Sequence, residues 1–342
     1  MPTQETAILD EVIASRRALL VGGGAALAAL AMPSIAHAAS TVSTYTDNDI
    51  LNFALNLEYL EANFYYLAAF GTSIGTTNPL YPTGAMLQTI TGTGTQGTVV
   101  AKASPKVPFA NTAIAGYAVE TAIEEGKHVA FLRSALGSAA VAQPQIDLMT
   151  SFNTLASAAG IGAAFDPFAN DLNFLVGAYI FEDVGVTAYH GAAPLFTTSS
   201  TGKTLLGAAA GILAVEAYHA GIVRTAIAAA DAANGNTALQ TLTQKISATR
   251  YALSKAAAPT SGTGSGAATA TDDIGVGTQT VALAGGSGAT ASTIVDADPT
   301  NVVAFARTTT QVLNIVTGGG ATTSGSKATG VFFPNGLNGL FS

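Results

Sequence analysis

The chain of 342 residues contains no cysteine and no tryptophan, and charged residues make up 10% of it. Without cysteine it has no disulfide, no iron–sulfur cluster and no thiol chemistry. The 21 acidic residues outnumber the 13 basic ones, which gives a formal net charge of −8 at pH 7. This balance offers no basic patch for nucleic acid. A metal site in this chain must use oxygen and nitrogen ligands, which suit iron or manganese.

Histidine is also scarce, and two of the four histidines stand three residues after a glutamate. The pairs are Glu125–His128 and Glu216–His219, and each lies in an apolar, alanine-rich stretch without proline, which predicts a helix. Positions three apart share one face of a helix, so each pair can hold a metal ion between a carboxylate and an imidazole. Four-helix bundles with two iron or manganese ions use two such pairs and one glutamate from each remaining helix.

An internal repeat indicates the remaining two glutamates. The tripeptide Leu-Asn-Phe at 51–53 recurs at 172–174, and Glu61 and Glu182 each follow ten residues after the start of their copy. Glu58 lies three residues before Glu61 and can face the same side of the helix. The first helix therefore offers both Glu58 and Glu61 as candidate ligands. In total, four carboxylates and two imidazoles are predicted to surround two iron or manganese ions.

Burying so many carboxylates without a cation would cost several kcal/mol for each, which favours a metal site over a set of buried polar residues. Tyr65 and Tyr189 are candidates for hydrogen bonds that support the ligands. Glu124 and Asp183 adjoin candidate ligands, and we expect them to face solvent or to support the site. His190 is expected at a helix end or on the surface rather than at the metal.

The first 38 residues are expected to be a targeting segment. Arg16 and Arg17 form a twin-arginine pattern, and the apolar run 21–31 that follows is too short to span a bilayer. Residues 36–38 read Ala-His-Ala, so we expect cleavage after Ala38; the alternative is a membrane-anchoring helix. The twin-arginine route exports folded proteins. The mature chain is therefore expected in the periplasm or outside the cell, without an integral membrane span.

Helical periodicity between turn-forming residues predicts the helices of the mature chain. Their ranges are 46–70, 110–136, 144–159, 167–189, 202–233, 237–257 and 299–316. Asp47 or Asn48 is expected to cap the first helix, and Pro144 to lie in the first turn of the third. Residues 71–109, rich in glycine, threonine and proline, are expected to form a long loop.

The composition changes after the sixth helix. Residues 259–295 are mainly Gly, Ser, Thr and Ala, which is typical of a linker or a loosely packed extended layer. The aromatic tail 331–336 is expected to dock on the bundle, because an exposed pair of phenylalanines would promote association. The predicted division is a signal peptide over 1–38, a helical bundle over 39–257 and an extension over 258–342.

The run 51–65 (LNFALNLEYLEANFY) resembles the first helix of the ferritin-like proteins grouped as desiccation-related proteins. The two Glu-x-x-His pairs, Glu182 and the Phe-Phe-Pro-Asn-Gly tail at 332–336 strengthen this resemblance, which covers about 46–233. The string at 56–58, with a tyrosine seven residues after Glu58, resembles the first helix of ferritins, and this resemblance favours Glu58 as the ligand from the first helix, whereas the internal repeat favours Glu61.

The resemblance implies an all-α fold, a ferritin-like four-helix bundle with a long crossover, a long first loop and a C-terminal extension. It implies a dinuclear iron or manganese centre that handles oxygen or peroxide in stress protection. The enzymatic class stays open between ferroxidase-, peroxidase- and manganese-catalase-like activity. The alternative is a non-catalytic structural or desiccation-protective envelope protein, whose metal site is vestigial or a folding staple. The long loop and the extension argue against a 24-subunit cage and leave another homo-oligomer open.

Overall fold

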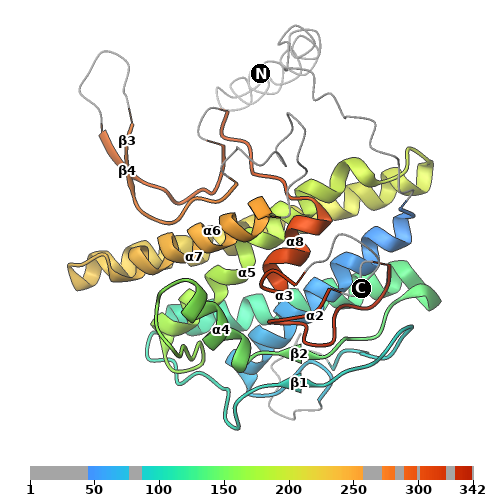
Figure 1. Ribbon diagram of the computed structural model, residues 1–342, viewed down its shortest axis with the longest axis horizontal. Helices are drawn as coiled ribbons and strands as arrows, with labels where there is room; N and C mark the ends of the chain where they lie inside the picture. Colours follow the sequence, from blue (N-terminus) through green and yellow to red (C-terminus); the bar gives the residue numbers. More distant parts are fainter. Residues whose placement is uncertain are drawn as a thin grey trace, which may run out of the picture. The chain divides into compact units, whose positions relative to one another are not determined.

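Two pairs of long helices form the centre of the fold (Figure 1). α2 (Asp47–Phe70) packs along α3 (Thr112–Leu136), and α5 (Asp171–Ala192) packs along α6 (Ser200–Asn234). The pairs meet where α2 contacts α5 and α3 contacts α6. The expected all-α four-helix bundle is confirmed.

The computed structural model describes residues 45–76, 87–256, 272–281, 289–298, 301–320 and 328–340. All of them lie in one unit of the chain. The predicted signal peptide, with its twin arginines, lies outside the described residues, as do 77–86 of the predicted loop and 259–271 and 282–288 of the predicted linker.

The ends of the four long helices follow local capping chemistry. Thr46, and not Asp47 or Asn48 as predicted, caps α2, because its hydroxyl accepts a hydrogen bond from the Asp49 N–H while the Asp49 carboxylate accepts from the Thr46 N–H. Side chains of Asn111, Asn170 and Ser199 cap α3, α5 and α6 by accepting hydrogen bonds from backbone N–H groups of the first turn. Glycines in the left-handed region end α2 at residue 71 and α6 at residue 235.

The crossover between α3 and α5 carries α4 (Thr150–Ala158), which begins later than the predicted 144. The preceding residues are extended because β2 (Ile146–Asp147) pairs in parallel with β1 (Val99–Val100) from the long first loop. The Asp147 carboxylate then accepts hydrogen bonds from the Met149 and Thr150 N–H groups and turns the chain into α4. Pro144 therefore lies before the helix, not in its first turn.

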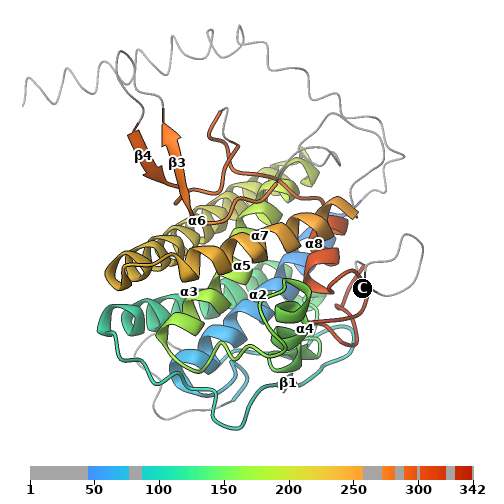
Figure 2. The ribbon, with the colours of Figure 1, turned by 60° about the vertical axis from the view of Figure 1, so that its left-hand side comes forward.

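The chain after α6 covers the α5 side of the bundle. α7 (Ala238–Ala256) packs on α5 and α6, and α8 (Thr309–Val316) packs on α5 and α7, as Figures 1 and 2 show. The predicted last helix was too long, because 301–308 are not helical and a capping box of Thr308 and Gln311 starts α8. Between α7 and α8, β3 (Thr278–Val281) pairs with β4 (Ala289–Ser292) as an antiparallel hairpin.

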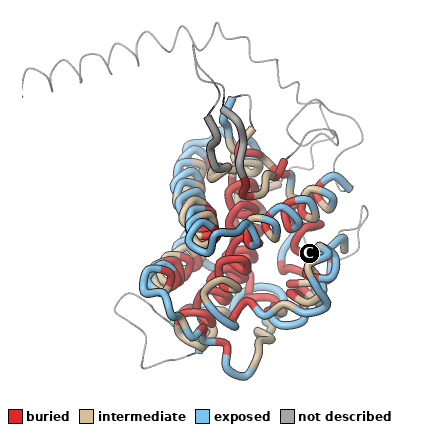
Figure 3. Tube along the Cα trace, turned by 90° about the vertical axis from the view of Figure 1, so that its left-hand side faces the viewer, coloured by how far each residue is buried: buried red, intermediate tan, exposed pale blue. Residues whose placement is uncertain are grey.

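The aromatic tail docks on the bundle as predicted. Phe332 and Phe333 are 1% and 0% exposed, and the Phe332 ring packs against Phe152 of α4 and Phe181 of α5. Burying an aromatic side chain of this size contributes about 1.5–3 kcal/mol. Figure 3 shows the buried residues concentrated along the central helices.

Buried ion pairs join the extension to the bundle. Arg250 of α7 contacts Asp183 of α5 at 2.9 Å and Asp273 at 2.7 Å, and Arg307 contacts Asp273 at 2.8 Å. Arg224 of α6 also contacts Asp183, at 2.9 Å. Part of the predicted linker is therefore packed: Asp273 is 5% exposed.

Among the described residues, one helix, α6, is long enough and apolar enough to cross a membrane, judged by length and composition alone. That test is weak evidence, since the core helix of a soluble protein passes it as well. Glu216, His219 and Arg224 of α6 are buried against other parts of the fold, which is the role of a bundle helix.

Candidate metal centre

All seven candidate ligands lie together in the bundle, and each of the four long helices contributes. The carboxylates are 5% exposed or less, and the two histidines are nearly as well buried. The seven are Glu58 and Glu61 of α2, Glu125 and His128 of α3, Glu182 of α5, and Glu216 and His219 of α6.

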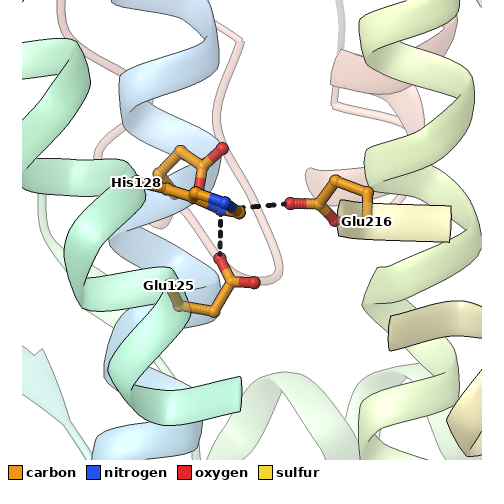
Figure 4. Close-up of side chains that lie close together, drawn as sticks. Glu125, His128 and Glu216 are labelled. Atoms are coloured by element: carbon orange, nitrogen blue, oxygen red, sulfur yellow. Dashed lines mark ion pairs between the residues drawn. The ribbon is translucent and has the colours of Figure 1, made fainter. Parts of the chain in front are cut away.

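One half of the cluster surrounds His128. Its Nδ1 lies 3.3 Å from Glu58 Oε2, 3.5 Å from Glu125 Oε2 and 3.6 Å from Glu216 Oε1. Figure 4 shows His128 between the Glu125 and Glu216 carboxylates, which come from the two facing helices α3 and α6. One ligand atom from each of these four residues lies within 4.8 Å of the others.

The other half surrounds His219. Its Nδ1 lies 2.9 Å from Glu125 Oε1 and 3.5 Å from Glu182 Oε2. One ligand atom each from Glu182, Glu216 and His219 again lies within 4.8 Å of the others. Glu216 belongs to both groups, and Glu125 contacts both histidines, so these two carboxylates stand between the halves.

The positions of the glutamates along their helices distinguish Glu58 from Glu61. Glu58 and Glu182 are each the twelfth residue of their helix, counted from Asp47 and Asp171. Each of them also contacts the histidine of its own half. The Leu-Asn-Phe repeat aligned Glu182 with Glu61 instead, because the tripeptide begins at the fifth residue of α2 but at the second residue of α5. The geometry therefore pairs Glu58 with Glu182, and Glu61 is a further carboxylate one turn away.

Tyrosines from the opposite helices hold this pair of carboxylates. Tyr65 of α2 donates a hydrogen bond to Glu182 Oε1, and Tyr189 of α5 donates one to Glu58 Oε1. Each tyrosine follows the glutamate of its own helix by seven residues, so the arrangement repeats across the bundle. Both predicted tyrosines thus contact candidate ligands. Hydrogen bonds of this kind fix the orientation of metal-binding carboxylates.

Of the other titratable residues considered from the sequence, Glu124 contacts the cluster, whereas Asp183 and His190 do not. Glu124, half-exposed, contacts His219 Nε2 at 2.8 Å, which lowers the pKa of the Glu124 carboxyl. Asp183 does not face solvent; it is 2% exposed and binds arginines outside the cluster. The Nδ1 of His190 lies 3.1 Å from the Phe305 carbonyl oxygen, near the end of α5 and away from the cluster.

The cluster contains buried polar atoms that make no hydrogen bond. They are Glu58 Oε2, Glu182 Oε2, both carboxylate oxygens of Glu125 and of Glu216, and Nδ1 of His128 and of His219. The 2.9 Å approach of His219 Nδ1 to Glu125 Oε1 brings opposite charges together without the geometry of a hydrogen bond. Buried polar atoms are normally paired, and unpaired ones cost about 1–3 kcal/mol each. Oxygen and nitrogen atoms that converge in this way fit a bound cation.

Burial and mutual repulsion determine how the carboxyl groups bind protons. Burial raises the pKa of Glu58 to about 7, with His128 opposing the rise and Glu125 adding to it. Burial and the neighbouring carboxylates hold the pKa of Glu61 and of Glu216 well above the usual range. Without cations, the cluster therefore keeps protons on several carboxyl groups near neutral pH.

Burial lowers the pKa values of the two histidines, whereas the neighbouring carboxylates raise them. Burial alone would lower the pKa of His128, but Glu58 and Glu125 raise it to about 12. Burial also opposes the charge of His219, and Glu182 and its neighbours raise that pKa more strongly. The pKa of Glu125 would rise on burial, yet His128 lowers it below its usual range. Positive charge in the centre is thus strongly favoured.

A second group of acidic side chains, Asp183, Asp273 and Asp296, also lies close enough to hold a cation. Arginines already occupy it, since Arg224 and Arg250 contact Asp183. Sequence reasoning missed this group. Arg224 follows Glu216 at the same distance as Arg133 follows Glu125, but Arg133 binds the Tyr59 hydroxyl and the Thr91 carbonyl oxygen, so this spacing gave no signal of the group.

The glycine at 185 was also missed. A β-carbon at this position would lie 2.4 Å from Glu216 Oε2, so only glycine leaves room for that carboxylate. Gly185 follows Glu182 by three residues, as Glu61 follows Glu58. Aligning α2 and α5 from their first residues would have placed Gly185 opposite Glu61 and drawn attention to it.

Comparison with known proteins agrees with the fold. A sequence model of the ferritin-like domain family matches residues 46–229, which is more than half of the chain. The desiccation-related protein PCC13-62 of Craterostigma plantagineum is 35% identical over 183 residues, 52% of this chain and 52% of that protein. The chain thus spans about half the length of this curated relative, and no solved structure matches the chain significantly. The chain belongs to the ferritin-like domain family, and its similarity is to the desiccation-related proteins within it.

Proposed function

We propose that this protein holds two iron or manganese ions in the bundle and handles oxygen or peroxide in protection against stress. The observation that supports the proposal is the set of eight unpaired, buried ligand atoms on Glu58, Glu125, His128, Glu182, Glu216 and His219. Their two groups share Glu216, which fits two adjacent ions with a common carboxylate.

The side chains of the cluster have different roles in such a centre. Glu58 with His128, and Glu182 with His219, would hold the ions, and Glu125 and Glu216, which lie between the two halves, would complete the set of ligands. Two redox-active ions supply electron transfer to oxygen or peroxide when bound. Tyr65 and Tyr189 keep their carboxylates turned toward the ions, and the buried position excludes bulk water.

Metal analysis of the purified chain tests this proposal. We expect about two iron or manganese ions per chain, and a lower content in His128→Ala and in Glu182→Gln. The matched control is His190→Ala, because His190 lies outside the cluster. A full metal complement in His128→Ala would show that His128 is not a ligand. Oxygen or peroxide consumption by the loaded wild type then identifies the reaction.

A second candidate function is protection without catalysis, which the name of the relative, a desiccation-related protein, favours. In that case the protein protects or stabilises the cell envelope without catalysis, and the site is vestigial or a folding staple. A wild-type protein that binds no metal, and whose melting temperature chelators leave unchanged, supports this function. Bound metal that stabilises the fold but consumes neither oxygen nor peroxide supports a folding staple.

We also propose that the chain is exported by the twin-arginine route to the periplasm or beyond the cell. The support is the pattern Arg16-Arg17 before a short apolar run. Changing both arginines to lysine should leave the precursor in the cytoplasm, with the helical domain folded and loaded with metal. A metal-free cytoplasmic form beside a loaded exported form contradicts loading before export.

A further inference from the structure

An internal cavity reaches the carboxylate cluster from the side of α5. It is enclosed by α2, α4, α5, α7, α8 and the aromatic tail, and its volume is about 50 Å³. The part of its lining formed by Leu60, Glu61, Val184 and Gly185 is called the deep end here, and it borders the cluster through Glu61 and Gly185. Figure 2 shows α4, α5, α7 and α8 grouped around this part of the fold.

The lining residues of the cavity differ in burial. Leu155, Ile161 and Leu253 are half-buried, whereas Leu60 and Val184 are 1% and 5% exposed, so we place the mouth at the first three. Apolar side chains make up nearly all of the lining; Glu61, Thr249 and Arg250 are its polar members. A molecule that enters must therefore leave water for an apolar surface.

Glycine 185 connects the cavity with the cluster. A β-carbon there would lie 3.5 Å from Glu61 Oε1 and 2.4 Å from Glu216 Oε2. The bare backbone of this residue thus borders both carboxylates and the cavity. A small molecule at the deep end lies beside the group that the two halves of the centre share.

Size and polarity restrict the occupant. A cavity needs roughly 10–15 Å³ to hold one water molecule, and one of about 150 Å³ binds benzene. The observed 50 Å³ admits a molecule of a few atoms and excludes an organic ring. Hydrogen peroxide carries two hydroxyl groups, and moving them to an apolar surface without hydrogen-bond partners is unfavourable. Dioxygen has no such groups, so the cavity favours it over peroxide.

We propose that this cavity is an access and holding site for dioxygen, which it presents at Glu61 and Gly185. The identification of dioxygen as the molecule used rests on the proposed metal function. The cavity itself, as a site for a small apolar molecule, does not depend on bound metal.

Xenon, which enters dry apolar cavities, is the probe for the metal-free protein. Under xenon pressure the wild type should give a saturable shift of the xenon NMR signal. Ala156→Leu adds bulk to the lining from α4 and should abolish the shift; Ala159→Leu, at a half-buried lining position, is a second variant should the first fail to fold. The matched control is Ala158→Leu, because Ala158 is exposed on the same turn and outside the lining, and it should keep the shift.

The second measurement uses protein loaded with ferrous iron. Ala156→Leu should slow oxidation by dissolved oxygen at low oxygen concentration, while oxidation by hydrogen peroxide and the bound metal content stay at wild-type values. Absence of saturable xenon binding in the wild type overturns the cavity site. Xenon binding with equal oxygen rates in wild type and Ala156→Leu overturns its role as the route. If the wild type binds no iron, the proposed metal function fails, and the xenon measurement still decides the cavity.

Discussion

Gly185 of α5 and Glu216 of α6 pack so closely that a β-carbon on the first would lie 2.4 Å from Oε2 of the second. No real β-carbon tolerates that approach, so a side chain at 185 and the present position of the carboxylate exclude each other. Glu216 belongs to both halves of the candidate centre. Because residue 185 is glycine and has no side chain, the shared carboxylate of Glu216 can occupy its position between the two halves.

Gly185→Ala should displace Glu216 and lower the metal content of the purified protein. Glu216 Oε2 ends a flexible side chain and can turn aside at little cost, and replacing glycine in a helix gains about 0.5–1 kcal/mol. We expect the loss of metal with little change in the melting temperature of the metal-free protein. Metal analysis and thermal unfolding measure both effects.

Gly211→Ala is the matched control for that variant. Gly211 is exposed on α6, and a β-carbon there would meet nothing within 4 Å. The substitution should stabilise the helix by about 0.5–1 kcal/mol and leave the metal content unchanged. A full metal complement in Gly185→Ala would contradict the role given to this close approach.

Tyr65→Phe and Tyr189→Phe should weaken metal binding to a similar degree. Each removes one hydrogen bond to a carboxylate, Tyr65 from Glu182 and Tyr189 from Glu58. Loss of a supporting partner of this kind typically costs about 10–100-fold in metal affinity. Tyr218→Phe is the control, because Tyr218 is 71% exposed. Titration with ferrous or manganous ion measures the affinities, and equal values for all three variants would contradict the prediction.

Most of the bundle was predictable because apolar periodicity and capping residues determine local structure. The failures came from contacts distant in sequence. Pro144 resembled a helix start, but the following residues pair as β2 with a strand 47 residues earlier. The predicted last helix was shortened because the Arg307 N–H donates to the Thr187 carbonyl oxygen of α5 instead of continuing a helix.

The site was predictable in its types of residue and less so in its register. Both Glu-x-x-His pairs were found because residues three apart share one face of a single helix, whatever the neighbouring helices do. The choice between Glu58 and Glu61 depends on how α2 and α5 align in space. The shared Leu-Asn-Phe tripeptide does not give that alignment, because it begins at different positions in the two helices. The buried arginines could not be located either, because Arg250 and Arg307 meet Asp273 only through tertiary packing.

The metal-free protein should lose stability as the pH rises from about 5 to about 8. The pKa of Glu58 rises from 4.5 to about 7 on folding, so its contribution is present below pH 4.5 and is lost toward pH 7. His128 stabilises the fold fully below pH 6.5 and loses this effect as the pH rises toward about 12. Glu125, whose pKa is lowered, acts in the opposite sense, but its contribution is lost only as the pH falls below 4.5.

Metal should reverse this dependence. Ions bind the deprotonated ligands, so the increase in melting temperature on loading should grow with pH over the same range. Thermal unfolding with and without manganous ion at several pH values measures the difference. A metal-free melting temperature that does not fall over this range would show that the carboxyl groups bind no extra protons in the folded state.

Arg250→Met should destabilise the whole domain. Arg250 is 3% exposed and contacts Asp183 at 2.9 Å and Asp273 at 2.7 Å. Removing one partner of a buried ion pair leaves uncompensated charge and typically costs about 3–5 kcal/mol. Because Asp273 belongs to the extension, its contact with the bundle should loosen as well, and proteolysis after α7 should become faster.

The comparison is Lys102→Met, which breaks a pair of similar length on the surface. Lys102 Nζ lies 2.6 Å from Asp166, with side chains 33% and 45% exposed. Exposed pairs contribute about 0–1 kcal/mol, since water screens both charges. Urea unfolding of the two variants should therefore differ by several-fold in lost stability. Equal losses would mean that the buried arginine is no more important to the fold than a surface lysine.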